Sequence, residues 1–283
     1  MTALAYRHQR VQRLRRLVAR RSARDAEGVF VIEGPKLLAE ALRAGVVPES
    51  VYVDPAGVGG GDGLTELLDR VFAAGGRLYE LEAGVLAKVA GTVTPQPVLA
   101  VVPRVEVTVD ELCQRDPTLV VVCVDVRDPG NAGTVLRSAE ASGASGVICC
   151  DGSVDVFNPK TVRASAGSIF HLPVVASGSV AEVLDRLGRA GLRRVGAVAR
   201  GGDPYWEVDL VAPTALVLGN EARGLPEAAA GLLDGSLTIP MAGRAESLNV
   251  GMAAAVVCFE AARQRRSAAH GGGNGPAAGH LSL

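Results

Sequence analysis

The chain has 283 residues, of which 48% are hydrophobic and only 4% aromatic, and its formal net charge is −1. This length can bury the core of one large domain or of two smaller ones, and we favour two. No apolar run approaches the roughly 18 residues that a membrane-spanning helix needs, so we predict a soluble protein without a membrane partner.

The five cysteines lie mostly within apolar runs and show neither CxxC spacing nor neighbouring histidines. We therefore interpret them as buried thiols and expect no metal site. An odd number of buried cysteines, with no apolar secretory signal, favours the reducing cytoplasm. The arginine-rich N-terminus would also suit an organelle transit peptide.

Residues 1–24 contain eight arginines and no acidic residue, so the rest of the chain is acidic. Val11, Leu14 and Val18 recur at helical spacing, which predicts an amphipathic helix with one docked and one basic face. This asymmetry indicates a nucleic-acid contact, with Arg10 and Arg13 as candidate RNA-binding residues. A solvated face on a capping helix is the alternative.

Residues 25–102 alternate short apolar stretches with helical ones and predict a small α/β domain. The apolar stretches are 29–32, 51–53, 77–81 and 98–102. Gly34 and Pro35 suit the start of a helix, which Gly45 would end. The glycine-rich loop 57–63 fits no phosphate-binding spacing.

A polar segment, residues 103–117, lacks periodicity and is predicted to be an interdomain linker. Residues 118–266 then alternate apolar and helical stretches. Strands are predicted at 119–126, 146–150, 172–175, 194–199, 215–218 and 237–239, and helices at 133–142, 159–168, 180–190 and 248–264. Continuous apolar strands predict a parallel sheet covered on both faces. Residues 267–283 are mostly Gly, Ala, His and Ser, which predicts a disordered tail.

Ligands of such a sheet collect beyond the carboxyl ends of its strands, where three loops are predicted to lie. In the loop that starts at Asp128, Asn131 suits a helix cap, and Arg137 could grip an RNA phosphate with its forked guanidinium. In the next loop, Glu221 lies between glycines and could accept hydrogen bonds from substrate or from Arg137. Each loop taken alone also fits an ordinary structural turn.

The last loop leads from the strand at 237–239 into the final helix. Ser247 suits a cap there, and Met241 and Leu248 offer apolar contact. The small residues that follow permit close packing on another helix, of this chain or of a second subunit. Core packing alone would explain most of this pattern.

Together, the three loops resemble the motifs of the SpoU (TrmH) family of RNA ribose methyltransferases, within the SPOUT superfamily. Asn131 with Arg137 resembles the first motif, and Gly219-Asn220-Glu221 with Gly224 resembles the second. Ile239-Pro240-Met241 with residues 246–250 resembles the third. Arg163 belongs to a matching intermediate segment, and residues 30–45, with Lys36, resemble a substrate-binding domain often fused in front.

The resemblance implies an α/β fold with a deep trefoil knot in the C-terminal domain, and a homodimer. It also implies S-adenosylmethionine as methyl donor, without a metal. The implied cofactor-binding residues are Leu218, Gly219, Asn220, Gly224, Ile239, Met241, Ser247, Leu248 and Asn249. The implied catalytic residues are Arg137, Asn131 and Glu221, and Arg163 and Lys36 join Arg10 and Arg13 as candidate RNA-binding residues.

Methyl transfer needs the 2′-oxygen aligned with the methyl group at about 3 to 3.5 Å, and a route for the hydroxyl proton. Arginine stays protonated in proteins, so a role as general base would need unusual local help. We therefore expect Arg137, assisted by Asn131 and Glu221, to bind the target phosphate and stabilise the developing alkoxide. We expect the proton of the 2′-hydroxyl to pass partly to solvent or to the phosphate.

The separate upstream domain and the basic arm favour a large structured RNA, and we place 23S ribosomal RNA ahead of transfer RNA. The composition, rich in Ala, Gly, Val and Arg, resembles that of high-GC actinobacteria, which makes an avilamycin-type antibiotic-resistance enzyme a further hypothesis. A catalytically silent RNA-binding protein is the main alternative. A nicotinamide enzyme has little support, because no G-x-G-x-x-G follows a predicted strand.

Overall fold

The computed structural model describes residues 3–55, 62–91 and 94–271. Its N-terminal part is a small α/β unit with strand order β1-β4-β2-β3. The strands are β1 (Val29–Glu33), β2 (Ser50–Val53), β3 (Arg77–Glu80) and β4 (Val98–Pro103). The helices are α1 (Gln9–Ala19), α2 (Arg21–Glu27), α3 (Pro35–Arg43), α5 (Asp62–Ala73) and α6 (Val85–Ala90). β4 is antiparallel to β1 and β2, and β3 is parallel to β2.

Helix α1 is the predicted arginine-rich helix, and it packs on this sheet. Val11, Leu14 and Leu17 are fully buried, so Leu17 rather than the predicted Val18 completes the apolar face. Most of the arginines on the other side are exposed. The predicted loop at 57–63 lies largely outside the described residues.

The C-terminal part contains a seven-stranded sheet in the order β7-β6-β5-β10-β8-β11-β9, and all its pairings are parallel. The strands are β5 (Leu119–Cys123), β6 (Gly146–Cys149), β7 (Val174–Val175), β8 (Arg193–Ala197), β9 (Asp203–Pro204), β10 (Thr214–Leu218) and β11 (Gly235–Thr238). The helices are α7 (Val109–Cys113), α8 (Pro129–Ala141), α9 (Pro159–Ala164), the 3-10 helix Ser168–Phe170, α10 (Val180–Arg189), α11 (Glu227–Ala230) and α12 (Val250–Gly271). This confirms the predicted parallel α/β sheet, although β9 and α11 have no counterpart in the prediction.

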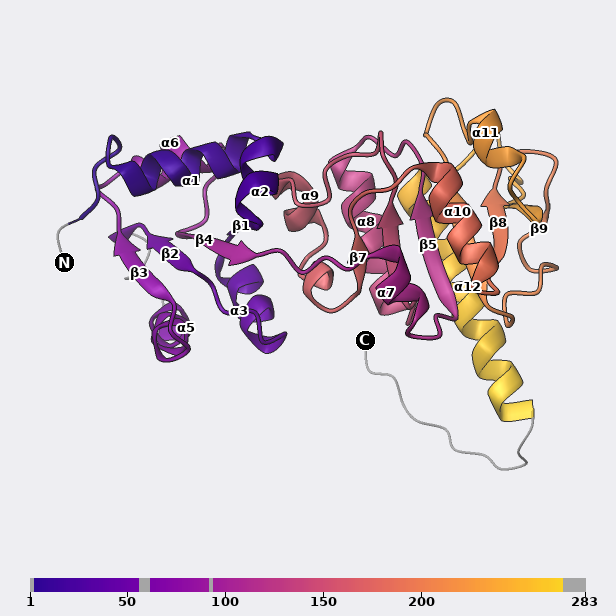
Figure 1. Ribbon diagram of the computed structural model, residues 1–283, viewed down its shortest axis with the longest axis horizontal. Helices are drawn as coiled ribbons and strands as arrows, with labels where there is room; N and C mark the ends of the chain where they lie inside the picture. The colour runs from indigo at the N-terminus through magenta and orange to yellow at the C-terminus, as the bar shows by residue number, and fades with distance from the viewer. Residues whose placement is uncertain (1–2, 56–61, 92–93, 272–283) are drawn as a thin grey trace.

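Helices cover both faces of this sheet, which explains why β5 and β6 carry no polar residue (Figure 1). Side chains of β5 alternate between two cores. Leu119 and Val121 belong to a core shared with α8 and α12, whereas Val120 and Val122 belong to one shared with α7 and α10. β5 is buried on both faces and has no polar position, as the sequence pattern indicates.

Two predicted irregular segments contain helices. The segment 103–117 includes α7, whose start is fixed by a reciprocal pair of hydrogen bonds between Thr108 and Glu111. This S/T-x-x-E spacing is a helix-start signal that the linker prediction did not use. Disorder predicted from residue 267 is wrong as far as Gly271, because α12 continues to that residue. Residues 272–283 lie outside the described residues.

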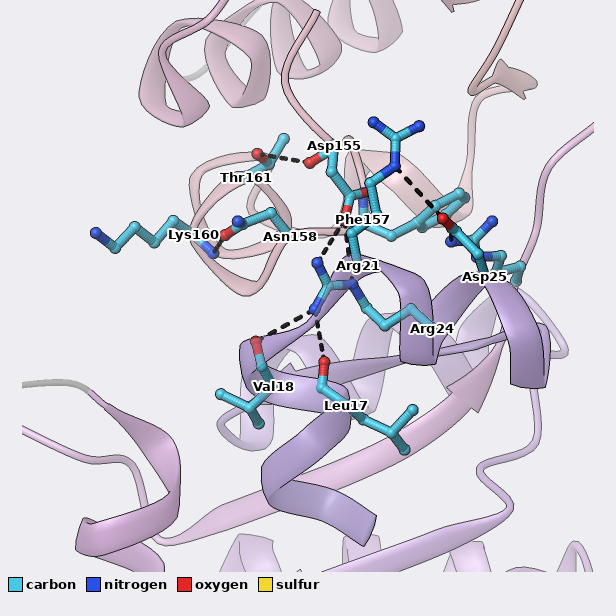
Figure 2. A network of polar contacts seen from close by, with 11 residues as sticks. Leu17, Val18, Arg21, Arg24, Asp25, Asp155, Phe157, Asn158, Lys160 and Thr161 are labelled. Atoms are coloured by element: carbon cyan, nitrogen blue, oxygen red, sulfur yellow. Dashed lines mark hydrogen bonds and ion pairs between the residues drawn. The ribbon is translucent and has the colours of Figure 1, made fainter.

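The two parts of the chain meet at Arg24, whose side chain is 2% exposed (Figure 2). Its guanidinium donates to the backbone oxygen of Leu17 at 2.6 Å and to that of Val18 at 3.2 Å. The same group forms a buried ion pair with Asp155, at 2.5 Å. Phe30 of β1 also packs against Phe157, with ring centroids 5.0 Å apart. This contact joins the N-terminal unit to the parallel-sheet unit.

Candidate active site

The first loop of the site follows β5 and opens α8. Asp128 caps this helix, because its side chain accepts a hydrogen bond from the backbone N–H of Asn131 at 2.8 Å. Pro129 occupies the first helical position, where its missing N–H costs nothing. The prediction that Asn131 caps the helix is therefore wrong. Asn131 lies inside the first turn, and its side chain is free for other partners.

Asn131 connects the three predicted motifs. Its Nδ2 donates to Glu221 Oε1 at 2.8 Å, and its Oδ1 accepts from Asn249 Nδ2 at the same distance. One amide thus contacts two residues that lie 90 and 118 positions further along the chain. We call Asn131, Glu221 and Asn249 the amide–carboxylate network. It orders three loops at the carboxyl ends of β5 and β10 and beyond β11.

The second loop is a tight turn after β10. Asn220 and Gly224 exchange backbone hydrogen bonds of 3.0 and 2.8 Å, and Asn220 Oδ1 accepts from the backbone N–H of Ala222 at 3.0 Å. A Cβ on Gly219 would lie 2.4 Å from the backbone carbon of Gly224, so only glycine fits there. The turn leaves the Glu221 side chain exposed and directed to Asn131.

The third loop leads into α12. Asn249 Oδ1 accepts from the backbone N–H groups of Gly251 at 2.9 Å and Met252 at 3.4 Å, so Asn249, not the predicted Ser247, caps this helix. A Cβ on Gly251 would lie 2.9 Å from Thr134 of α8. The small residues of α12 thus allow it to approach α8 of the same chain.

Arg137 lies two turns into α8, and its side chain is exposed. It follows Asn131 by six positions, which places it about 240° further around the helix. Within the described ranges, Arg137 has no hydrogen bond or ion pair, and it does not join the amide–carboxylate network. The structure therefore brings together Asn131 and Glu221 of the predicted catalytic group, and leaves Arg137 apart.

A cavity of about 590 Å³ lies beyond the carboxyl ends of β8, β10 and β11. The predicted cofactor-binding residues that line it are Leu218, Gly219, Asn220, Gly224, Ile239, Ser247 and Leu248. Met241 and Asn249 are not among the lining residues. Glu221 lines the cavity too and connects it to Asn131.

Arg200 is a lining residue that sequence reasoning missed. Its side chain is 82% exposed and lies 3.9 Å from the carboxylate of Glu246, which also lines the cavity. It directly follows the predicted strand 194–199. The rule that ligands bind beyond the carboxyl ends of parallel strands could have found it.

The predicted RNA-binding residues differ in their surroundings. Lys36 is exposed at the start of α3 and lines a groove of about 670 Å³ that also includes Ala166 of the other unit. Arg10 is exposed, with its guanidinium carbon 4.7 Å from the ring centre of Tyr79. Both remain accessible to a ligand.

Arg13 and Arg163 are engaged within the chain. Arg13 forms ion pairs with Glu27 and Glu49, both at 2.6 Å, and the hydrogen bond that it donates to Glu49 raises the pKa of Arg13. Arg163 lies 3.0 Å from Glu33, whose side chain is 5% exposed, while the Arg163 side chain is 44% exposed. Both arginines therefore have structural roles that the sequence pattern did not indicate.

The structure also bears on metals and membranes. Within residues 3–55, 62–91 and 94–271, no group of three or more His, Cys, Asp or Glu side chains could hold a metal ion. Among the helices described, none combines the length and the hydropathy that crossing a bilayer requires.

Comparison with known proteins supplies a family for both units. The model of the SpoU rRNA methylase family matches residues 118–259, and that of an MRM3-like substrate binding domain matches residues 8–100.

Curated relatives include the 23S rRNA (guanosine(2553)-2′-O)-methyltransferase RlmP of Bacillus subtilis. It is 34% identical over 83% of this chain and 89% of that protein. The 23S rRNA (uridine(2479)-2′-O)-methyltransferase of Streptomyces viridochromogenes is 40% identical over 61% of this chain and 62% of its own. Among solved structures, the SpoU methyltransferase AviRb from Streptomyces viridochromogenes, in complex with the cofactor AdoMet, aligns with a TM-score of 0.80. That alignment has 33% identity and covers 92% of this chain and all of the other.

Proposed function

Because the chain belongs to the SpoU rRNA methylase family, we propose that it transfers a methyl group from S-adenosylmethionine to a ribose 2′-hydroxyl of 23S ribosomal RNA. The observation that carries this proposal is the contact between the cavity and the amide–carboxylate network. Glu221 belongs to both, so a substrate held by the network would lie beside whatever the cavity binds.

The residues present fit S-adenosylmethionine. A cavity of about 590 Å³ lies within the range of about 300 to 1,000 Å³ that is usual for small-molecule sites. Leu218, Ile239 and Leu248 offer apolar surface for an adenosine, and the backbone of Gly219 permits close approach. When bound, this cofactor supplies an electrophilic methyl group on a sulfonium. We assign its binding to the seven predicted residues that line the cavity, with Met241 and Asn249 flanking them.

In the proposed mechanism, position contributes much of the rate. The amide–carboxylate network holds the three loops and presents Glu221 to the ribose. Arg137 stays protonated, so its role is to bind the target phosphate and stabilise negative charge on the 2′-oxygen. The proton leaves to solvent or to the phosphate. Because Arg137 has no partner in the described part of its own chain, it is accessible for such a contact.

Recognition of the RNA is assigned to the N-terminal unit together with the groove beside α3. Lys36 and Arg10 are exposed and positively charged, which suits phosphate contacts. Arg163 keeps N–H donors beyond those facing Glu33, so it can add a contact without leaving its ion pair. We assign a lesser role to Arg13, because two carboxylates already surround its guanidinium.

The finer architecture belongs to the same proposal. We propose that the segment from β11 through α12 forms the deep trefoil knot implied by the family. The chain returns from β11, which lies beyond β10 and β8, to pack α12 against α8, the helix that follows β5, and this supports the proposal.

We also propose a homodimer. Met252 and Phe259 are 61% and 47% exposed and lie seven residues apart on α12, which gives an apolar stripe suited to a second copy.

We propose a cytoplasmic location, where ribosomal RNA is found. Resistance to a ribosome-targeting antibiotic stays a further prediction. Comparing the antibiotic susceptibility of cells with and without the gene tests it.

The proposed substrate is tested by measuring methyl incorporation from labelled S-adenosylmethionine into unmodified 23S rRNA and transfer RNA. Label in 23S rRNA that is lost with Arg137→Ala supports the proposal. Label in transfer RNA alone would move the substrate to that class. Binding of both RNAs without label would make the chain a catalytically silent RNA-binding protein.

A further inference from the structure

A second cleft, of about 400 Å³, lies beside the cofactor cavity. It is situated beyond the carboxyl ends of β5 and β6, whereas the cofactor cavity lies beyond those of β8, β10 and β11. Arg223 and Gly224 line both. The turn after β10 is therefore the wall between the two hollows, and a group bound in the second cleft would lie next to the reacting centre.

Two arginines from different loops meet in this cleft on one carboxylate. Arg127 Nε donates to Asp125 Oδ1 at 2.6 Å, and Arg223 Nη2 donates to Asp125 Oδ2 at 2.6 Å. The arginine side chains are 63% and 64% exposed, against 22% for Asp125. Each guanidinium has five N–H donors and uses one of them here, so both retain donors for a ligand.

Asn220, in the loop after β10, holds the backbone at Asp125 in place. Asp125 has a φ of +56°, in the left-handed region that residues other than glycine seldom adopt. Asn220 Nδ2 donates to the backbone oxygen of Asp125 at 2.9 Å, and Asn220 Oδ1 accepts from the backbone N–H of Arg223 at 3.1 Å. One asparagine thus holds both loops. Strained backbone that neighbours hold in place is typical of functional sites.

Each carboxylate of the cleft already has a partner within the chain. Both oxygens of Asp125 face arginines, and the hydrogen bond from Arg127 holds the pKa of this carboxyl below its usual value. The other acid, Asp151, accepts from the backbone N–H of Gly178 at 3.1 Å. The two guanidinium groups keep N–H donors beyond these bonds, and such donors suit an anion.

We propose that Arg127 and Arg223, positioned by Asp125, bind a backbone phosphate of the RNA substrate beside the nucleotide that is methylated. Forked guanidinium groups match phosphate oxygens better than the single ammonium of lysine does. This inference rests on the proposed function, because it places the RNA across the wall between the two hollows.

The test compares Arg127→Gln and Arg223→Gln with Arg189→Gln, a matched control. Arg189 is 80% exposed at the end of α10, where it pairs with Asp185. We expect each glutamine variant to raise the KM for 23S rRNA about tenfold, the loss typical of a charge-assisted hydrogen bond, with the KM for S-adenosylmethionine unchanged. The slope of log binding constant against log salt should also fall by about 0.7 to 0.9 per lost contact. The control should match the wild type.

Arg223→Lys is a further variant, because it keeps the positive charge but lacks the planar set of guanidinium donors. It should retain the salt slope and lose part of the affinity, and thermal denaturation checks that each variant folds. Unchanged RNA binding and salt slope in both glutamine variants would overturn the inference. A higher KM for S-adenosylmethionine with an unchanged RNA salt slope would overturn it too, and would place the arginines on the cofactor. RNA binding and its salt slope are measured without turnover, so they report on this site even if the wild type transfers no methyl group.

Discussion

Asn131 uses both ends of its amide, one to donate to Glu221 and the other to accept from Asn249. An asparagine amide supplies a donor and an acceptor in one plane, which neither alanine nor an ionised aspartate does. Loss of this amide would leave Glu221 and Asn249 without the partner that orients them. The three loops would then lose the one side chain that joins them all, although Asn220 would still link the first two.

We therefore predict that Asn131→Ala lowers the methyl-transfer rate by about 100-fold, the cost of a displacement of about 1 Å at a reacting centre. Steady-state kinetics with 23S rRNA measure it. Asn158→Ala is the matched control, since Asn158 caps α9 outside the network and should leave kcat unchanged. A wild-type kcat in Asn131→Ala would remove this residue from the mechanism.

The burial of the cysteines gives a prediction about thiol reactivity at pH 8. Burial raises the pKa of both Cys150 and Cys258 to about 12, so at pH 8 only about one thiol in ten thousand is ionised. Cys113 is the partly exposed thiol, and burial raises its pKa as well. A chromogenic disulfide reagent at pH 8 should modify at most Cys113 in the folded protein, and all five cysteines in denaturant. Rapid reaction of Cys150 or Cys258 in the folded protein would contradict their burial.

At the scale of elements, Asp128 fixes where α8 begins and hence where Asn131 lies. We predict that Asp128→Ala lowers the free energy of unfolding by about 1 kcal/mol, the usual cost of losing a helix cap. Urea denaturation measures this change. Asp128→Asn should keep most of the stability, because its side-chain oxygen can still accept from Asn131. Equal losses in the two variants would show that capping is not the cause.

Most elements of the parallel sheet were predictable from the sequence, because strands such as β5 are wholly apolar and contrast with the helices between them. The residues that cap the helices were harder to predict. Asp128 and Asn131 are both good capping residues, and the proline after Asp128 was the signal that decides between them. The same ambiguity affected Ser247 and Asn249. The separation of Arg137 from Asn131 could have been predicted, because six positions on a helix correspond to about 240° of rotation.

At the scale of the whole molecule, the joint between the two units depends on Arg24 and Asp155, which are 131 residues apart. Nothing in the sequence pairs them, because one belongs to a run of arginines and the other to a loop. The N-terminal arginines thus serve two purposes. Arg24 joins the units, while exposed neighbours such as Arg16 face solvent.

We predict that Arg24→Met lowers the free energy of unfolding by about 3 to 5 kcal/mol, because it leaves the Asp155 carboxylate buried without its partner. The double variant Arg24→Met with Asp155→Leu should recover much of the loss, since it removes both charges. Arg16→Met, on the exposed side of α1, is the control. Thermal and urea denaturation measure all three, and a single variant as stable as the control would contradict the buried ion pair.

The central claim is that the methyl group goes to a ribose 2′-oxygen. Digestion of 23S rRNA to nucleosides after reaction with labelled S-adenosylmethionine, followed by mass spectrometry, tests it most directly. The account predicts one nucleoside whose added methyl group remains with the ribose when the base is cleaved off. A methyl group that leaves with the base would contradict it.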